Sequence, residues 1–423
     1  MTVETILSYI FFTSNILTSG MLGYAVYSRI KHIISSKRKN EEDKDNNNEE
    51  NAKKDIAVLI PAWNEGKELQ KTLDDILSKP VKRVMVATYP NDTKTLQALE
   101  PYKGKVDIIL NRLNGPTNKF QNLCNAFYEI KKSNPDYSYI LILDAEVRPA
   151  ENYFDVVKKY LGEDTILQTR ILSYPFYSRN LFEEIMSRMY LVAQSQIQEI
   201  VDKSRAKMGR DIFLKGAGMI FPIKSLDALL EICKKDKKSF WDELTKLAED
   251  TELAILLSGK YKYKIVFIDG TYTWEDSPSR LSVIIKRYAR WFKGNFANFI
   301  KYNKTILKKF THYFILNIQA ILHPLTYAAA FLTLYRSIFP AKYAIIHPFL
   351  FYFNVFFALY YLLFPPLLAT RLENKLKLPK KKFSFTKNLI ANLVYNYVTP
   401  APVILGFYDI LRKKTQWYKT ERD

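Results

Sequence analysis

The stretch Tyr139–Pro149, YILILDAEVRP, decides the fold of this chain. Its first five residues are apolar and β-forming, and such a short run predicts a buried parallel strand. Asp144 follows the run directly, and Glu146 comes two residues later. Open α/β sheets bind ligands at the carboxyl ends of their strands, and paired carboxylates suit a divalent cation that also binds phosphate oxygens. The structural alternative is that Asp144 caps a helix and Glu146 is solvated.

Further strands of the same kind are predicted on the amino-terminal side of this stretch. Apolar runs occur at Ile56–Ile60, Arg83–Thr88 and Val106–Leu110, with helical patterns between them. Short strands that alternate with helices predict an α/β fold with a doubly wound, mostly parallel sheet. Polar side chains follow three of these four strands, namely Asn64, Glu65, Asn91, Asp92, Asp144 and Glu146.

The composition of the chain narrows the classes of partner that it can be expected to bind. The chain has 423 residues, with 63 Lys+Arg against 43 Asp+Glu and a net charge of +20. That length suits two or three domains, and the charge suits nucleic acid, an anionic membrane face or phosphorylated substrates. The 29 Tyr and 27 Phe are typical of membrane interfaces. The widely separated Cys124 and Cys233 predict neither a zinc site nor a disulfide framework, and they permit a reducing compartment.

An uncleaved membrane anchor is predicted within residues 1–34. Thr5–Tyr27 is uncharged and long enough to cross a bilayer. Basic residues follow this segment instead of preceding it, unlike the pattern of a signal peptide, so we expect the amino terminus outside and the next segment in the cytoplasm. Residues 35–55 form a predicted charged linker, because they contain no large apolar side chain.

The carboxyl-terminal third is predicted to return to the membrane. Leu281–Phe299 is a basic amphipathic helix and opens an interfacial region over 281–312. Phe314–Tyr335 and Tyr343–Ala369 predict a transmembrane hairpin within 313–370.

Residues 371–423 predict a basic loop, re-entrant or interfacial helices and a tail. Leu389–Leu411 is interrupted by Pro400 and Pro402 and has basic residues on both flanks, which favours a re-entrant hairpin over a full crossing. The expected location is therefore the plasma membrane, in a multi-pass arrangement with the catalytic domain in the cytoplasm.

Short motifs recur in a characteristic order along Ile56–Gly294. These motifs are PAWNE (61–65), PNDTKT (90–95), GPTNKFQNLCNA (115–126), LDAEVRP (143–149), KGAGMIF (215–221), AEDTEL (248–253), WEDSPSR (274–280) and KRYARWFKG (286–294). Together they resemble the membrane-integrated family 2 glycosyltransferases of the GT-A fold, the branch of the cellulose, hyaluronan, chitin and poly-N-acetylglucosamine synthases. The resemblance implies a GT-A domain over 56–280.

The resemblance implies a donor and metal site at the strand ends. Asp144 and Glu146 stand where the family holds Mg²⁺ or Mn²⁺ with the donor diphosphate, although the family more often has Asp at the second position. Glu65 and Asp92 match positions that contact the uridine of the donor. Lys119 is expected to contact the diphosphate; its alternative is a solvated loop lysine.

The resemblance also implies an acceptor site with a catalytic base. Gly216, Ala217 and Gly218 would let the acceptor sugar approach the backbone, since glycine has no Cβ; the alternative is an ordinary turn. Asp250 matches the general base, which takes the proton of the attacking hydroxyl. Glu249 is expected at the acceptor, and its alternative is favourable charge at a helix start.

The basic helix carries the last motif of the resemblance. Arg290 and Trp291 match residues that meet the diphosphate, and Trp291 also the acceptor. Arg287 stands where the family usually has Gln, so its acceptor role is not carried over. The alternative for all three is a membrane-surface helix.

The predicted enzyme is an inverting hexosyl- or N-acetylhexosaminyltransferase that uses a nucleoside-diphosphate sugar, UDP-linked, and extends a glycan as a polysaccharide synthase. One alternative is transfer of a single sugar to a polyprenyl phosphate or another lipid-linked acceptor. An alternative of another class is a non-catalytic basic membrane protein that recruits nucleic acid or anionic lipid. The expected partners of the enzyme are the donor, a glycan or lipid-linked acceptor and membrane lipids, without nucleic acid; homo-oligomerisation stays open.

Overall fold

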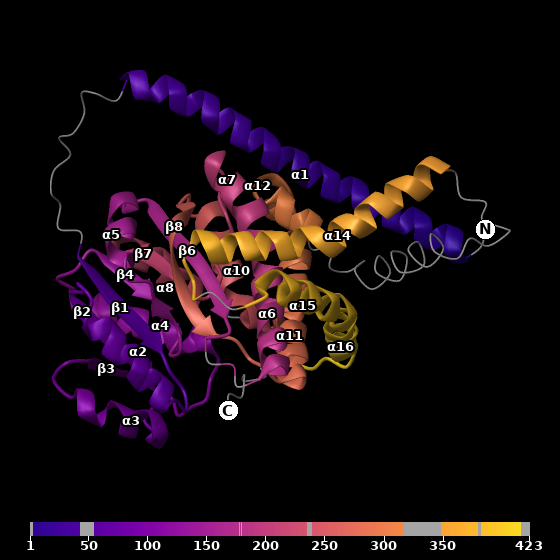
Figure 1. The fold of residues 1–423 in the computed structure, drawn as a ribbon. Helices are drawn as coiled ribbons and strands as arrows, with labels where there is room; N and C mark the ends of the chain where they lie inside the picture. The colour runs from indigo at the N-terminus through magenta and orange to yellow at the C-terminus, as the bar shows by residue number, and fades with distance from the viewer. Residues whose placement is uncertain are drawn as a thin grey trace. The chain divides into compact units, whose positions relative to one another are not determined.

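A computed structural model describes residues 3–42, 55–176, 178, 180–234, 239–316, 318, 348–379 and 382–415 (Figure 1). The chain divides into two compact units. The sheet unit comprises Ser35–Leu172 and Gly209–Glu275, and the helical unit comprises Met1–Ile34, Ser173–Met208 and Asp276–Asp423.

An eight-stranded sheet forms the centre of the sheet unit, counted over the described residues, with the order β3-β2-β1-β4-β7-β6-β8-β5. The first four of these strands pair in parallel, whereas β7 is antiparallel to both β4 and β6, and β5 to β8. The strands are β1 (Ile56–Pro61), β2 (Arg83–Thr88), β3 (Asp107–Leu110), β4 (Tyr139–Ile142), β5 (Arg148–Pro149), β6 (Thr165–Tyr174), β7 (Met219–Pro222) and β8 (Lys264–Asp276).

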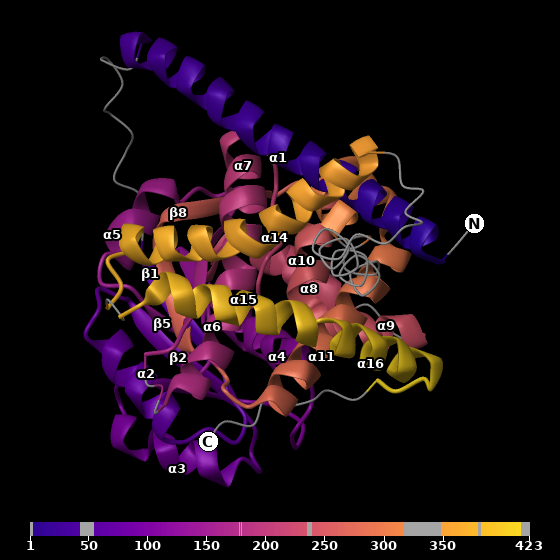
Figure 2. The ribbon, with the colours of Figure 1, turned by 45° about the vertical axis from the view of Figure 1, so that its right-hand side comes forward.

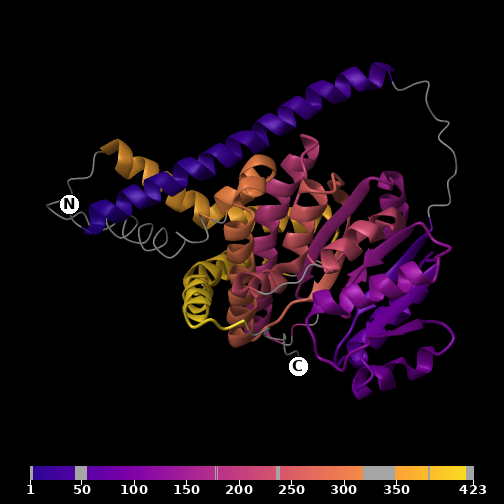
Figure 3. The same cartoon turned by 180° about the vertical axis from the view of Figure 1, so that it is seen from behind.

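Short helices connect these strands, and Figure 3 shows the strands of the sheet unit from behind. The α-helices of the sheet unit are α2 (Lys67–Leu77), α3 (Thr93–Leu99), α4 (Lys119–Lys132), α5 (Tyr153–Val157), α8 (Leu226–Cys233), α9 (Phe240–Thr245) and α10 (Glu249–Gly259). Short 3-10 turns are η1 (Glu100–Tyr102), η2 (Lys158–Tyr160), η4 (Ile223–Ser225) and η5 (Lys246–Ala248).

The sheet forms because its central strands are apolar on both faces. Every residue of β4 is buried, and β1 is buried from Ile56 to Ile60. Val58 lies opposite Val84 on one neighbouring strand and Leu141 on the other, and all three belong to one core cluster. Burying a side chain of this size stabilises the fold by about 1.5–3 kcal/mol. The predicted α/β class and the four parallel strands are therefore confirmed.

The later half of the sheet differs from the simple parallel arrangement. The KGAGMIF motif leads into β7, which runs antiparallel beside β4. Trp274, the first residue of the WEDSPSR motif, lies in β8, because it pairs with Arg148 and its ring centroid lies 4.9 Å from the Arg148 guanidinium. Strand β8 ends at Asp276, so it includes the first three residues of this motif, Trp274–Asp276.

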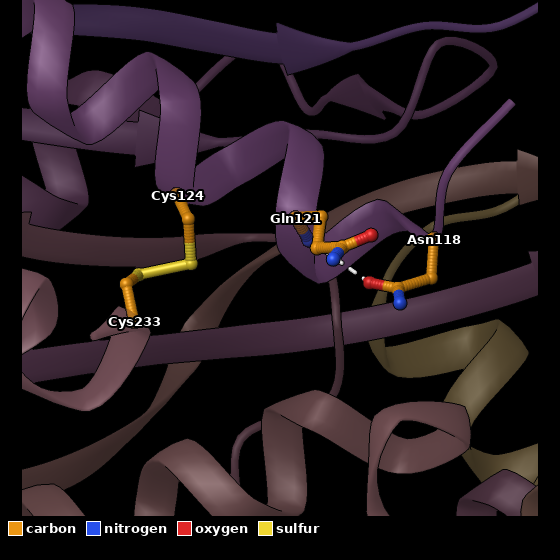
Figure 4. Close-up of a disulfide and its surroundings, with 4 residues drawn as sticks. All are labelled: Asn118, Gln121, Cys124 and Cys233. Atoms are coloured by element: carbon orange, nitrogen blue, oxygen red, sulfur yellow. Dashed lines mark hydrogen bonds between the residues drawn. A yellow bond between two sulfur atoms is a disulfide. The ribbon is translucent and has the colours of Figure 1, made fainter. Parts of the chain in front are cut away.

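The two cysteines form a disulfide, which corrects the prediction from their spacing. Cys124 and Cys233 lie 109 residues apart, but α4 and α8 pack together and bring their Cα atoms to 5.7 Å (Figure 4). Cys124 is on the same helix as Asn118 and Gln121, whose hydrogen bond caps the start of α4. The disulfide therefore joins the helix that begins at the strand-end loops to α8.

The helical unit contains long apolar helices. Its elements are α1 (Val3–Glu42), α6 (Leu181–Gln196), the π-helical η3 (Ile197–Asp202), α7 (Lys203–Lys207), α11 (Leu281–Lys301), α12 (Asn303–Lys309), α14 (Pro348–Lys375), α15 (Ser384–Val398) and α16 (Pro400–Leu411). Helix α15 packs against both α6 and α14, as Figure 2 shows for α14 and α15. The predicted amphipathic helix at Leu281–Phe299 is confirmed by α11.

Two described segments are long and apolar enough to cross a membrane, Tyr352–Lys375 and Ser384–Leu411. The second contains the break between α15 and α16 at Thr399, where Pro400 follows. Almost all of the predicted span Phe314–Tyr335 lies outside the described residues. Helix α1 contains the predicted anchor and continues to Glu42, so Ser35–Glu42 of the predicted linker is helical; this part is rich in Lys, Arg and Glu, which favour helices.

Replacing Cys124 and Cys233 together with serine should lower the free energy of unfolding by about 2–4 kcal/mol, because the disulfide closes a long loop in the unfolded chain. Thermal unfolding of the purified chain, with and without the disulfide, measures this difference. A reductant should lower the melting temperature of the wild type and leave that of the double variant unchanged. Equal melting temperatures in all four conditions would contradict a disulfide in the folded protein.

Candidate active site

The loops after β1 and β2 are held together by the carboxylate of Asp92. Its Oδ2 accepts hydrogen bonds from the backbone amide of Asn64 and the hydroxyl of Thr88, both at 2.9 Å, and its Oδ1 accepts from the amide of Thr95 at 3.2 Å. The side chain of Asp92 is buried and caps α3. Both carboxylate oxygens of Asp92 therefore bind the protein itself, and Asn64 is held with a positive φ of 55°.

Glu65 lies in the same loop. Its backbone amide donates to the hydroxyl of Thr95 at 2.9 Å, and the residue is half-buried. Asp92 and Thr95 thus fix the backbone on which Glu65 is presented. These contacts bring two of the predicted donor residues, Glu65 and Asp92, to one edge of the sheet.

A third loop, before α4, is joined to the first two. Asn91 and Gly115 exchange hydrogen bonds of 2.7 and 2.8 Å, and the hydroxyls of Tyr89 and Thr117 lie 2.7 Å apart. A Cβ on Gly115 would lie within 2.8 Å of ring atoms of Tyr89 and Trp63, so only glycine fits there. These contacts fix the position at which α4, and with it Lys119, begins.

Lys119 is the central cation of the site. Its Nζ donates to Asp144 Oδ1 and to the carbonyl of Gly216, the latter at 2.8 Å, and lies 3.9 Å from Glu249 Oε1. Burial alone would lower the pKa of Lys119, but Asp144, Glu249 and Asp250 together raise it. Lys119 is therefore charged, and the solvated-lysine alternative does not describe it.

Asp250 lies beside the same glycine. A Cβ on Gly216 would be 3.4 Å from Asp250 Oδ2 and 3.6 Å from Lys119 Nζ, so both side chains lie against the same face of this glycine. Burial, reinforced by the charge of Glu249, raises the pKa of Asp250 to about 7. The backbone amide of Thr251 donates to its Oδ1 at 2.8 Å.

The predicted acidic start of α10 is confirmed, since the helix begins at Glu249. Asp250 and Glu249 both lie in its first turn, where the helix dipole favours negative charge. A carboxyl group with a pKa near neutrality is suited to general acid–base chemistry, because it can both take up and release a proton near pH 7.

Asp144 and Glu146 occupy a turn directly after β4, in which the amide of Val147 donates to the carbonyl of Asp144 at 2.9 Å. Both acidic residues are half-buried. No cluster of three or more His, Cys, Asp or Glu side chains suited to a metal occurs among the described residues. Two accessible carboxylates do fit Mg²⁺ or Mn²⁺ bound with a diphosphate, because the phosphate oxygens and water supply the other ligands.

The remaining predicted site residues, Arg290 and Trp291, belong to α11 in the helical unit. There the Trp291 ring contacts Tyr288 at 5.4 Å between centroids, and the Arg287 guanidinium lies 4.8 Å from the Trp291 ring. Their assignment to the donor and the acceptor stays a prediction.

One charged residue near the base was not predicted from the sequence. Lys215 contributes positive charge that lowers the pKa of Asp250, opposing the effect of burial. Its position as the first residue of KGAGMIF, directly before the predicted acceptor residues Gly216, Ala217 and Gly218, is the signal that the sequence contains.

With the geometry established, comparison with known proteins identifies the class of protein. The model of the family described as "Glycosyltransferase like family 2" matches residues 53–294, which is more than half of the chain. The chain belongs to this family, and it is a glycosyltransferase.

Two relatives extend over most of the chain. It is 24% identical over 390 residues to a probable glycosyltransferase, YdaM, of Bacillus subtilis (strain 168), which covers 87% of this chain and 86% of the relative. Its structure resembles that of the mannosyltransferase PcManGT from Pyrobaculum calidifontis, solved with GDP-Man and Mn²⁺, with a TM-score of 0.52 and 13% identity; the match covers 95% of this chain and 99% of that one. The predicted GT-A fold is confirmed.

Alanine at Gly218 should destabilise the chain more than alanine at Gly216. Both glycines have positive φ, +66° and +84°, which costs a residue with a Cβ about 1–2 kcal/mol. At Gly218 the Cβ would also lie 2.4 Å from Thr169 Oγ1, whereas at Gly216 the nearest atom is 3.4 Å away. Such overpacking adds about 1–3 kcal/mol, measurable by urea unfolding. Equal losses in the two variants would contradict the tight packing at Gly218.

Asp250→Asn should gain stability relative to the wild type as the pH rises from about 4 to about 7. The unfolded chain releases the Asp250 proton near its usual pKa of about 3.9, while the folded chain keeps it until the pKa of about 7. The wild type therefore loses stability across this window, and asparagine does not. Melting temperatures in chelator at several pH values measure the difference, with Asp227→Asn on the surface as the control. A pH-independent difference would contradict the raised pKa.

Proposed function

We propose that this chain is a membrane-embedded, inverting glycosyltransferase that moves a hexose or N-acetylhexosamine from a UDP-linked donor to a growing glycan, as a polysaccharide synthase. The observation that carries this proposal is the arrangement around Gly216. Lys119, which pairs with Asp144, and Asp250, which has a pKa of about 7, both lie against this glycine.

The donor diphosphate is proposed to bind beside Asp144, Glu146 and Lys119. A bound Mg²⁺ or Mn²⁺ would supply Lewis-acid stabilisation of the leaving diphosphate. Lys119 adds a fixed positive charge at the start of α4. The mannosyltransferase relative was solved with GDP-Man and Mn²⁺, which supports a nucleoside-diphosphate donor and a divalent metal.

The base of the reaction is proposed to be Asp250. In a single displacement the acceptor hydroxyl oxygen forms a bond to the anomeric carbon, while the bond from that carbon to the diphosphate oxygen breaks. Asp250 takes the hydroxyl proton, and the diphosphate leaves with the bonding electron pair. One carboxylate suffices, since the leaving group needs no protonation once its charge is balanced.

The glycine turn is proposed to admit the acceptor. Gly216 and Gly218 both have positive φ and flank the buried Ala217. Glu249, half-buried beside Lys119, is proposed to bind acceptor hydroxyls, and Arg290 and Trp291 to complete the donor and acceptor contacts.

Membrane embedding is supported by one face of α14. Five large apolar side chains recur on it at helical spacing and are at least 41% exposed, namely Tyr352, Phe356, Leu359, Leu363 and Leu367. On another face, Asn354 is buried and accepts a hydrogen bond of 3.3 Å from Asn15 of α1. Polar pairs of this kind join helices within a bilayer. We propose a multi-pass protein of the plasma membrane with its sheet unit in the cytoplasm.

Membranes that contain the wild type should transfer sugar from at least one donor in a panel of UDP- and GDP-sugars, in the presence of Mn²⁺. Asp250→Asn should reduce the rate about 10²–10⁴-fold, the usual contribution of a general base. In the wild type, kcat/KM should rise with pH through about 7, because only the ionised carboxylate accepts a proton. Asp227→Asn, a surface carboxylate on α8, is the matched control and should keep full activity.

Product size separates the outcomes of that experiment. A ladder of polymer lengths agrees with a polysaccharide synthase. A single added sugar on a lipid-linked acceptor rejects the polymerising function but still supports a glycosyltransferase. Full activity in Asp250→Asn would reject the proposed base. Salt-sensitive binding of nucleic acid without any transfer would favour the non-catalytic alternative.

A further inference from the structure

Gln168 is a buried polar side chain in the sheet unit that the proposed reaction does not use. It lies on β6 with no exposed surface, opposite Met219 of β7. Backbone pairing between these strands continues to Gly218, whose carbonyl accepts from the amide of Thr169 at 3.0 Å. The residues that precede Gly218 in the chain are held by the side chain of Gln168 instead of by backbone pairing.

All hydrogen-bonding atoms of the Gln168 amide are used on backbone groups. Its Oε1 accepts from the amide of Lys215 at 2.8 Å, and its Nε2 donates to the carbonyls of Ala217 and Thr169, both at 2.8 Å. The orientation of the amide follows from these partners, because an N–H group requires the oxygen and two carbonyls require the NH₂ group.

These hydrogen bonds fix the backbone on both sides of Gly216. Lys215 and Ala217 are its two neighbours, so their hydrogen bonds set the direction in which the Gly216 carbonyl points. That carbonyl accepts from Lys119 Nζ at 2.8 Å, and the Cα of the same residue faces Asp250 Oδ2. Gln168 therefore determines the spacing between the central cation and the proposed base without touching either.

We propose that Gln168 is a positioning residue for sugar transfer, which holds the Lys215–Gly216–Ala217 turn so that Lys119 and Asp250 both keep their places beside Gly216. This inference rests on the proposed function. Misplacing catalytic groups by about 1 Å can lower a rate about 100-fold. Loss of the Gln168 hydrogen bonds should therefore lower the rate of the chemical step.

Other side chains cannot replace the amide here. Glutamate would place a negative oxygen against two carbonyl oxygens, and asparagine is one methylene too short to reach both neighbours of Gly216. Methionine has nearly the same shape but leaves one amide and two carbonyls without their buried partner. The Gln168→Met variant therefore removes these hydrogen bonds while it keeps the volume of the core.

The test compares Gln168→Met with Gln70→Met in the full-length chain. Gln70 is a suitable control, because it lies in the same unit, and its side chain donates to the carbonyl of Ala98 at 3.1 Å. Transfer by Gln168→Met should show a kcat lowered about 10–100-fold, with the KM for the donor within about threefold of the wild-type value. Gln168→Met should melt at a lower temperature than Gln70→Met, because it leaves three buried backbone groups without a partner, so rates are compared per folded molecule.

Hydrogen exchange provides a readout that does not depend on activity. Amides within Lys215–Gly218 should exchange at least about tenfold faster in Gln168→Met than in the wild type or Gln70→Met. If Gln168→Met fails to fold, Gln168→Asn, which keeps the amide and the polarity, replaces it in both measurements.

The outcomes separate the inference from the proposed function. A wild type that transfers no sugar rejects the proposed function, and the exchange of the Lys215–Gly218 amides still decides the role of Gln168. The inference is overturned if the exchange is unchanged. It is also overturned if the wild type is active and kcat per folded molecule in Gln168→Met equals that in Gln70→Met.

Discussion

The sheet unit depends on the compensation of charge at the ends of its parallel strands. Asp144 follows β4, whereas Glu249 and Asp250 begin α10, and like charges brought together in a half-buried site repel one another. Lys119 offsets this repulsion, because it pairs with Asp144 and lies close to the other two. The same balance makes the site chemically useful, since it leaves Asp250 with a pKa near neutrality.

A second constraint operates in the helical unit, where charges are buried completely. Arg188 has no exposed surface and donates to Glu184 at 2.9 Å, Glu373 at 3.0 Å and Asn388 at 2.7 Å. These partners lie on α6, α14 and α15, so one guanidinium joins three helices. Lys293 of α11 similarly pairs with Asp409 at 2.8 Å in a buried contact with α16. Losing one partner of such a network leaves a buried charge uncompensated, so these helices favour a single arrangement.

Local patterns predicted much of the sheet unit from the sequence. The bounds of β2 agree with the prediction, because its apolar residues and the polar residues that flank it mark the strand locally. Strand-end position also indicated Asp144, whereas Lys119 and Asp250 were predicted from the resemblance of their motifs to the family. Three features join segments that are distant in sequence, namely the disulfide, the pairing of Trp274 with Arg148, and the hydrogen bonds from Gln168 to the neighbours of Gly216. No local periodicity encodes such contacts, and a glutamine within an apolar strand carries no sign of its partner.

The Cys124–Cys233 disulfide also has a meaning at the level of the cell. Structural disulfides persist in oxidising compartments and are rare in most cytosols, with hyperthermophilic cells as the exception. A sheet unit in a reducing cytoplasm would carry two thiols, and α4 would then be joined to α8 by packing and the exposed Lys131–Asp227 pair alone. The oxidation state of these two sulfur atoms in freshly isolated membranes therefore indicates whether the chain folded in an oxidising or a reducing compartment.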